Sequence, residues 1–259
     1  MKGILFYFSG TGNTKWVADK FKERFNFYGS ELELVNIEKE PSYNMEEYGF
    51  MIIGTSIYAG CGPKIMDEFI NNMPAGNGKM KCILYSTQGA KTCAATSIYG
   101  NILQSKGYEV LIKAMIQMPN NYYFLNQKQA DSTQNDAILE SASKKVKELT
   151  GDFIQNNSVN ESAGKIGSEI GKLSSKFFKK WLPKMSENLT STDECTKCSY
   201  CLNNCPAGNI TFENGRAVFH SKCIMCLRCI HGCPVNAIRY KGKKVEQTQK
   251  EIIKSLELR

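Results

Sequence analysis

The sequence contains no uninterrupted apolar run that approaches the length of a membrane-spanning helix. Its first apolar run ends at Phe8 with only Lys2 ahead of it, so it is too short for the core of a signal peptide. Outside the last quarter of the chain the only cysteines are the isolated Cys61, Cys82 and Cys93, a usage that fits a reducing compartment. We therefore expect a cytoplasmic protein with no transmembrane segment.

The chain is long enough to bury a sizeable core. It has 259 residues, of which 42% are apolar. A chain of this length and composition is typical of one large and one small domain.

The remaining eight cysteines form two runs of identical spacing near the C-terminus. In each run two residues separate the first cysteine from the second and the second from the third. Three residues separate the third from the fourth, and a proline follows directly. The runs also read as an internal repeat, since each leads into a short segment that ends in isoleucine. They are Cys195, Cys198, Cys201, Cys205 and Pro206, followed by Cys223, Cys226, Cys229, Cys233 and Pro234.

This spacing is typical of two iron-sulfur clusters. Three closely spaced thiolates wrap one cubane cluster, and the fourth reaches the other cluster. Zinc sites built from CxxC pairs are one alternative, but they leave the regular third and fourth cysteines unexplained. Disulfides are another, though thiols packed this densely look like ligands. The predicted ligand sets are Cys195, Cys198, Cys201 and Cys233 for one cluster and Cys223, Cys226, Cys229 and Cys205 for the other.

All eight ligands and both prolines occur in the order found in the bacterial two-[4Fe-4S] ferredoxins, which the chain resembles over about residues 190–241. The resemblance implies a small α+β domain with two cubane clusters. Apolar residues between and after the ligands would exclude water from the clusters. The expected shell consists of Ile224, Leu227, Ile230, Val235 and Ile238.

A second signal lies at the N-terminus. The apolar run 3–8 predicts a buried parallel strand, and it leads into the loop Ser-Gly-Thr-Gly-Asn-Thr at residues 9–14 and then an amphipathic helix. Backbone N–H groups at such a helix start, together with hydroxyls, can satisfy phosphate oxygens. No Gly-Lys-Ser/Thr triplet follows, and Lys15 stands where a dinucleotide fingerprint needs its last glycine, so neither ATP nor NAD is indicated.

Alternating strands and helices continue to about residue 150. Five parallel strands with such helices predict a doubly wound sheet, whose ligand binds outside the carboxyl ends of the strands. Further strands are predicted at 32–37, 50–55, 82–87 and 108–118, with helices near 63–73, 93–106 and 130–150. The loops at the ligand-binding end are then 9–13, 56–62, 88–92 and 119–122.

The first loop and this strand order resemble flavodoxin over about residues 1–150, which implies bound FMN. Tyr58 would stack on the isoalloxazine, although ordinary packing is the alternative for a tyrosine at a strand end. Backbone groups of 58–62 and 88–90 would bond the polar flavin edge. The residues implied are Ser9, Thr11, Gly12, Asn13 and Thr14 for the phosphate, and Ser56, Tyr58, Ala59, Gly60, Thr87, Gln88 and Gly89 for the rest of FMN.

The chain departs from free flavodoxins in one respect. It lacks their longer, acidic third loop with a second aromatic residue, so the outer face of the flavin is either open to solvent or covered by the ferredoxin domain. Cys61 and Cys93 fall beside the flavin loops, where we expect small buried side chains rather than reactive thiols.

The formal net charge of +8 does not indicate a nucleic-acid partner. No basic patch is interleaved with aromatic residues as in a binding module. Two oxidised clusters and a phosphate monoester would also lower the net charge to about +2.

We expect four segments. Residues 1–152 form the flavodoxin-like FMN domain, 153–189 a helical linker, 190–241 the ferredoxin domain and 242–259 a helical tail. Within the linker, Ile166, Ile170, Leu173, Phe177, Phe178, Trp181 and Leu182 predict an amphipathic helix that ends at Pro183. We expect its apolar face to pack against a domain, with a membrane-surface helix as the alternative. In the tail, Ile252, Ile253 and Leu256 should dock on the protein.

Together these features resemble the flavodoxin-ferredoxin fusions that serve as bacterial electron carriers. FMN accepts two electrons and each cluster one, so the expected role is electron transfer to or from a redox partner protein. The alternatives are a reductase of a small organic substrate at the flavin and a redox-sensing module. His220 and His231, the only histidines, lie far in sequence from the flavin loops, which argues against a reductase. A homo-oligomer stays possible.

The ligand spacing predicts the effect of Cys201→Ala. This change should damage chiefly one cluster, because Cys201 is assigned to one ligand set only. The iron content should then drop clearly below about eight atoms per chain, the complement of two cubane clusters. Retention of all eight irons in the purified variant would contradict the assignment.

Overall fold

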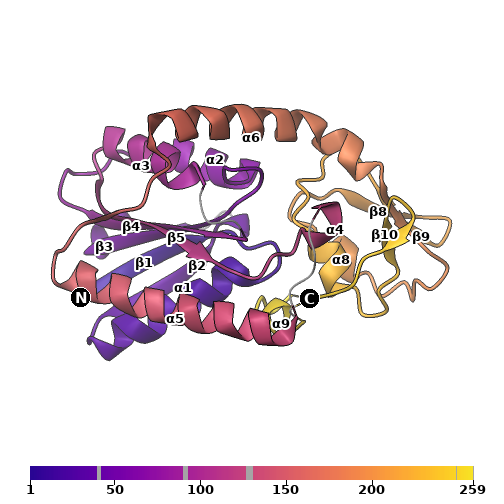
Figure 1. The fold of residues 1–259 in the computed structure, drawn as a ribbon, viewed down its shortest axis with the longest axis horizontal. Helices are drawn as coiled ribbons and strands as arrows, with labels where there is room; N and C mark the ends of the chain where they lie inside the picture. The colour runs from indigo at the N-terminus through magenta and orange to yellow at the C-terminus, as the bar shows by residue number, and fades with distance from the viewer. Residues whose placement is uncertain (40–41, 90–92, 127–130, 249, 259) are drawn as a thin grey trace. The chain divides into compact units, whose positions relative to one another are not determined.

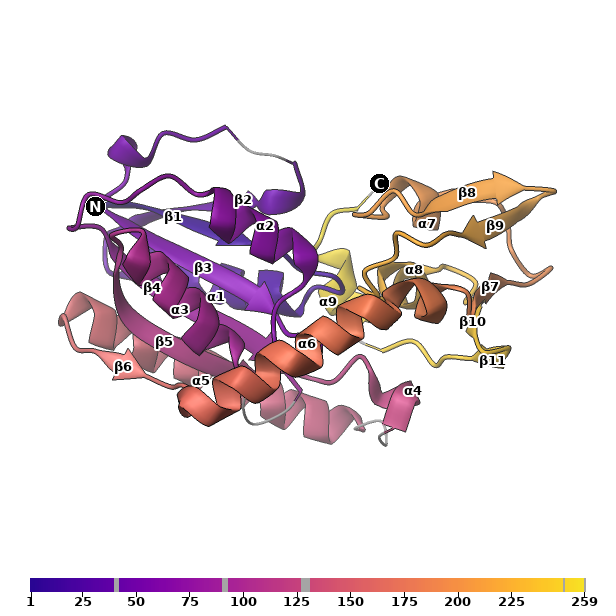
Figure 2. The ribbon, with the colours of Figure 1, turned by 90° about the horizontal axis from the view of Figure 1, so that it is seen from above.

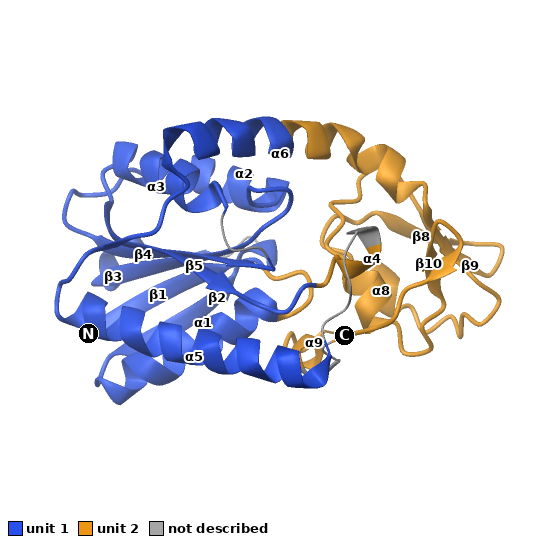
Figure 3. Cartoon of the chain, in the orientation of Figure 1, with its two compact units in different colours: residues 1–8, 13–120, 129–175 blue, residues 9–12, 121–128, 176–259 orange. Residues whose placement is uncertain are grey.

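The computed structural model describes residues 1–39, 42–89, 93–126, 131–248 and 250–258. The chain divides into two compact units, shown in Figure 3. The first comprises residues 1–8, 13–120 and 129–175, and the second comprises residues 9–12, 121–128 and 176–259. The predicted domain boundaries at 152, 189 and 241 stay predictions.

A parallel sheet of six strands forms the centre of the first unit. Its strand order is β2-β1-β3-β4-β5-β6, and every neighbouring pair is parallel. The predicted doubly wound α/β fold and its five strands are confirmed. The strands are β1 (Lys2–Tyr7), β2 (Glu31–Asn36), β3 (Phe50–Ser56), β4 (Lys81–Gln88), β5 (Glu109–Gln117) and β6 (Val159–Asn160).

The sixth strand was not predicted. β6 has two residues and pairs with Ile112 and Lys113 of β5, at the edge of the sheet shown in Figure 2. A strand this short has no periodicity for a sequence pattern to reveal. The opposite edge strand, β2, alternates between exposed Glu31, buried Leu32 and exposed Glu33, as a half-buried strand should.

Helices cover both faces of the sheet. In Figure 1, α1 (Asn13–Phe27) and α5 (Ser132–Ile154) lie on one face, and α2 (Lys64–Asn72) and α3 (Ala95–Ser105) on the other. Phe25 of α1 stacks on Phe50 of β3 with ring centroids 4.6 Å apart, and Phe153 of α5 packs on both rings. Asp131 caps α5 with a reciprocal capping box to Gln134. Ala130, the predicted start of that helix, lies outside the described residues.

Helix α6 (Gly164–Ser186) passes from the first unit into the second. The prediction that it ends at Pro183 is wrong, because the helix continues for three residues and Glu187 donates its N–H to the Pro183 carbonyl. The expectation that its whole apolar face packs against a domain is also wrong. Phe178 and Leu182 pack on the second unit, whereas the other five predicted positions, Ile166, Ile170, Leu173, Phe177 and Trp181, are exposed.

No helix among the described residues is long and apolar enough to cross a membrane.

The second unit is a small α+β structure, as predicted for this part of the chain. Leu189, Ile230, Ile238 and Tyr240 belong to its apolar core. Its sheets are β11-β10-β7 and the hairpin β8-β9, with the remaining short helices around them. The elements are α4 (Tyr123–Asn126), β7 (Leu189–Ser191), α7 (Tyr200–Asn203), β8 (Ile210–Glu213), β9 (Arg216–Phe219), α8 (Arg228–Gly232), β10 (Ile238–Tyr240), β11 (Lys243–Lys244) and α9 (Lys250–Lys254).

The tail is only partly helical. β11 precedes α9, a helix of five residues, so the predicted helical tail 242–259 is too long. Ile252 and Ile253 are buried and Leu256 is half-buried, as docking of the tail requires.

Candidate cofactor sites

The two cysteine runs share an unusual backbone conformation. Lys197 and Met225 have φ of 58° and 55°, and Ser199 and Leu227 both lie near 62°. Each pair is 28 residues apart in the sequence, at the same place within its run. The repeat seen in the sequence is therefore a repeat of backbone geometry.

This conformation has an energetic cost. An L-residue in the left-handed helical region has a conformational energy roughly 1–2 kcal/mol higher than in the right-handed region. Four non-glycine residues in this region, two in each run, persist only because the surrounding structure fixes them. Left-handed residues between right-handed ones also turn successive N–H groups toward a common point, which favours an anionic group such as a ring of thiolates and sulfides.

The same two runs line two cavities. One cavity is lined by Cys195, Cys198, Cys201 and Cys233, and the other by Cys205, Cys223, Cys226 and Cys229. Each thus gathers three cysteines of one run and the fourth cysteine of the other. These are the two sets of four that the spacing predicts.

Backbone N–H groups point at the thiol sulfurs. Asn209 N and Ala237 N each lie 3.3 Å from the Sγ atom four residues earlier, those of Cys205 and Cys233. Met225 N lies 3.2 Å from the Sγ of Cys223. Hydrogen bonds to sulfur stabilise the thiolate and help to set the reduction potential of a cluster.

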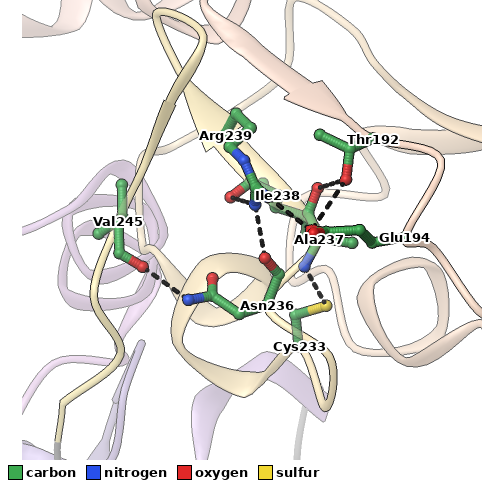
Figure 4. Close-up of polar contacts among 8 residues, drawn as sticks. All are labelled: Thr192, Glu194, Cys233, Asn236, Ala237, Ile238, Arg239 and Val245. Carbon is green, nitrogen blue, oxygen red and sulfur yellow. Dashed lines mark hydrogen bonds and ion pairs between the residues drawn. The ribbon is translucent and has the colours of Figure 1, made fainter.

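Figure 4 shows how the end of the second run is tied to the start of the first. Thr192 donates its N–H to the Ala237 carbonyl at 3.0 Å, and its hydroxyl lies 3.3 Å from the same oxygen. Arg239 forms an ion pair with Glu194 at 2.6 Å. Glu194 precedes Cys195, and Ala237 comes shortly after Cys233. These bonds therefore bring the first cysteine of the first run together with the last cysteine of the second run.

Some of these thiols are poorly suited to ionise without a bound cation. Burial raises the pKa of Cys201 to about 11 and that of Cys226 to about 12. Burial also raises the pKa of Cys229 well above its usual range, and neighbouring cysteines raise it further. Thiols with a raised pKa match a positively charged metal core, which makes each thiolate favourable.

Most of the predicted water-excluding shell is buried. Leu227, Ile230 and Ile238 are buried and Ile224 is half-buried. Val235 is the exception, since 39% of its surface is exposed. Val235 nevertheless lines the cavity that holds Cys195, Cys198, Cys201 and Cys233, so it belongs to the predicted shell although part of it reaches the surface.

Arg228 was missed by the sequence analysis. Its side chain is 2% exposed and donates to the carbonyls of Ser9 at 2.8 Å, Gly10 at 3.0 Å and Asn204 at 3.0 Å. Asn204 immediately precedes Cys205, so the guanidinium joins the second cysteine run to the end of the first and to the first loop. The available signal was one cation within an otherwise apolar run, Cys-Ile-Met-Cys-Leu-Arg-Cys-Ile.

The other predicted site lies at the carboxyl ends of β1, β3 and β4. Asn13 Oδ1, Ser56 Oγ and Gln88 Nε2 are buried with no hydrogen-bond partner among the described residues. The other polar atom of each of the two amide side chains is hydrogen-bonded: Asn13 Nδ2 donates to the Pro119 carbonyl, and Gln88 Oε1 accepts from the Ser86 hydroxyl. Leaving such an atom unpaired costs about 1–3 kcal/mol, so all three fit contact with a polar ligand.

The first loop is held by its own hydroxyls. Ser9 Oγ accepts from Gly12 N at 3.1 Å, and Thr11 Oγ1 accepts from the Asn121 amide. Each hydroxyl therefore keeps its own proton for donation to an acceptor such as phosphate. Thr14 instead pairs with Thr87 at 2.8 Å. Gly12 has a φ of 101°, and a Cβ there would lie 2.3 Å from the Ile252 carbonyl oxygen, so only glycine fits.

The loop at residues 56–62, which follows β3, is a tight turn. Tyr58 and Cys61 exchange backbone hydrogen bonds, and the central residues Ala59 and Gly60 have φ of 51° and 88°, as in a type I′ turn. The Tyr58 ring is 7% exposed and Cys61 is buried. Gly60 O accepts from Ala94 N at 2.8 Å.

The loop at residues 88–92, which follows β4, is only partly described. Gly89 is exposed, and Ala90, Lys91 and Thr92 lie outside the described residues. Cys93 is buried, and its Sγ lies 3.3 Å from Ser86 Oγ. Burial raises the pKa of Cys82, the remaining isolated cysteine. Gly171 of α6 packs on Ala94, where a Cβ would lie 2.2 Å from the alanine Cβ.

Comparison with known proteins defines the class. Residues 4–101 match the model of the flavodoxin domain family, and residues 194–238 match the 4Fe-4S dicluster domain. The chain thus carries a flavodoxin domain followed by a 4Fe-4S dicluster domain, with FMN and two [4Fe-4S] clusters as its cofactors. This pair of domains gives it a role in electron transfer.

Solved structures similar to the chain include two bacterial flavodoxins. Oxidised flavodoxin 2 from Bacillus cereus is 18% identical with a TM-score of 0.44, over 60% of this chain and 99% of that one. The Fusobacterium nucleatum flavodoxin bound to flavin mononucleotide is 11% identical with a TM-score of 0.42, over 61% and 99%. No curated protein matches the chain.

The repeated left-handed backbone predicts the outcome of two glycine substitutions. Lys197→Gly removes the cost of a left-handed L-residue at an exposed position and should stabilise the holoprotein by up to about 1 kcal/mol. Thr196→Gly, at the neighbouring exposed residue without a positive φ, should destabilise it by about 0.5–1 kcal/mol. The measurement is the urea midpoint for loss of cluster absorbance without oxygen. Equal decreases in both variants would show that the left-handed conformation carries no cost.

Proposed function

We propose that the chain passes electrons between FMN and its two [4Fe-4S] clusters, and on to or from a redox partner protein. FMN exchanges two electrons and can release them singly, and each cluster carries one. The observation that carries the proposal is the pair of four-cysteine cavities in the same chain as a flavodoxin domain. Residence in the cytoplasm stays a prediction.

The proposed cluster ligands follow the two cavities. Cys195, Cys198, Cys201 and Cys233 would hold one cluster, and Cys205, Cys223, Cys226 and Cys229 the other. The N–H groups of Met225, Asn209 and Ala237 would remain bonded to ligand sulfurs and so favour the reduced, more negative cluster. Buried Ile230 and Ile238 would keep water away.

The proposed FMN contacts come from three loops. Ser9 and Thr11 would donate hydroxyl protons to the phosphate, with Gly12, Asn13 and Thr14 supplying the helix start. The unpaired atoms of Asn13, Ser56 and Gln88 support polar contacts with the cofactor. Tyr58, Ala59, Gly60, Thr87 and Gly89 complete the proposed set, with Tyr58 as the stacking ring.

Electron passage of this kind needs no acid or base from the protein. Burial lowers the pKa of His231 to about 4, and its ring contacts the Asn121 carbonyl and Thr248 N. His231 is therefore a neutral structural residue at physiological pH. The other histidine, His220, contacts the Thr211 hydroxyl in the β8-β9 hairpin.

Anaerobic purification and rapid mixing test the proposed function. The chain should contain about eight irons, eight sulfides and one FMN, and should take up about four electrons from dithionite. The reduced protein should then reduce a one-electron acceptor such as a c-type cytochrome. Cys226→Ala should keep FMN but slow this step at least tenfold, because one cluster is lost. Unchanged transfer in this variant would show that FMN delivers electrons without that cluster.

Gln88 provides a test of the FMN site. Gln88→Met removes the buried Nε2 donor while keeping the side-chain length, and should raise the Kd for FMN about tenfold, the equivalent of about 1.4 kcal/mol. Gln104→Met, on the exposed surface of α3, is the matched control and should leave the Kd unchanged. Quenching of flavin fluorescence in a titration of apoprotein measures both. Equal Kd values in the two variants would place FMN away from Gln88.

A further inference from the structure

Helix α6 presents an exposed apolar stripe that the electron-transfer sites do not use. Its side chains are 79% exposed at Ile166, 64% at Ile170, 57% at Leu173, 56% at Phe177 and 51% at Trp181. Successive helical residues are rotated by about 100°, so these five side chains fall within an arc of about 80° along the helix. We call them the α6 stripe.

The α6 stripe is separate from the face that attaches the helix to the protein. Gly171 packs on Ala94, Ser175 is buried, and Phe178 and Leu182 pack against the core of the second unit. These positions lie roughly 100° or more from Ile166 around the helix. The helix is thus fixed by one face and leaves a second apolar face exposed.

Positive charge accompanies the stripe. Between Gly164 and Ser186 the helix carries six lysines and one glutamate. Lys184 lies 5.1 Å from the centroid of the Trp181 ring, in line with the stripe. The others along its flank are Lys165, Lys172, Lys176 and Lys180, which fall on the same side of it by helical rotation and are all exposed.

We propose that helix α6 docks the protein on an anionic phospholipid surface, with the α6 stripe in the acyl boundary and the flanking lysines at the headgroups. A helix that lies in a membrane interface typically has Trp, Phe and Leu on one face and lysines on the polar face. Anionic headgroups attract such lysines, and apolar side chains gain free energy by leaving water.

The same features disfavour other occupants. The core of a protein interface is depleted in lysine, and the stripe has no hydrogen-bonding side chain other than the Trp181 indole to fix the position of a partner. A second copy of the chain would place one lysine-rich helix against another, which like-charge repulsion opposes. A fluid anionic surface needs no fixed register and neutralises the lysines.

Vesicle binding by the holoprotein tests this proposal. Purified protein with its iron and flavin content verified is sedimented with vesicles of phosphatidylcholine, with or without phosphatidylglycerol. We expect binding to the anionic vesicles, loss of binding at high salt, and weak binding to neutral ones. The chain has two tryptophans, so in a Trp16→Phe background the emission of Trp181 should shift to shorter wavelength on binding.

Matched variants separate the two contributions. Ile170→Ser or Phe177→Ser should each lower the partition coefficient at least tenfold, whereas Phe27→Ser, at a 78% exposed position of α1, should not. Changing Lys172, Lys176 and Lys180 together to Gln should lower it roughly 100-fold. The same charge change at exposed Lys22, Lys144 and Lys147 should have a much smaller effect.

Three results would overturn the proposal. One is the absence of binding to anionic vesicles by a protein with full iron and flavin content. Another is an equal effect of the two lysine triples, which would mean that net charge alone drives binding. The last is a shift of Trp181 emission that occurs without lipid as the protein concentration rises, together with a dimer in sedimentation velocity. This result would assign the stripe to a second copy of the chain.

Discussion

The second unit depends on one constraint, the convergence of four thiols from two distant segments on each of two cavities. Convergence requires the left-handed backbone that recurs at Lys197 and Met225, and at Ser199 and Leu227. The apolar core of Ile230, Ile238 and their neighbours fixes that backbone, and the bonds from Thr192 and Arg239 hold the two runs together. Sheet, hairpin and short helices serve mainly to maintain this geometry.

The features that the sequence could predict are those in which each residue type has one dominant reason to be there. A fully apolar run such as Ile4 to Phe8 is compatible with few elements besides a buried strand, and eight cysteines at a repeated spacing specify their own grouping. Both features depend on local chemistry. They were therefore available without knowledge of the tertiary structure.

Other features depend on contacts that no local pattern encodes. β6 exists because Val159 and Asn160 meet β5, and α6 continues past Pro183 because tertiary packing of Leu182 outweighs the lost N–H bond. The sequence pattern predicts one face for the apolar positions of α6, and only the packing partners show that Phe178, rather than Phe177, attaches the helix to the protein. Arg228 was overlooked because the carbonyls of Ser9, Gly10 and Asn204 that it contacts come from distant parts of the chain.

The shared cysteines also bear on how the protein is made. During synthesis, Cys195, Cys198 and Cys201 leave the ribosome well before their fourth partner, Cys233, and Cys205 waits for Cys223, Cys226 and Cys229. Neither cavity can be completed from one run alone. The cavity with Cys205 is complete in sequence first, at Cys229, and the other follows only four residues later, so insertion of either cluster has to await synthesis of both cysteine runs.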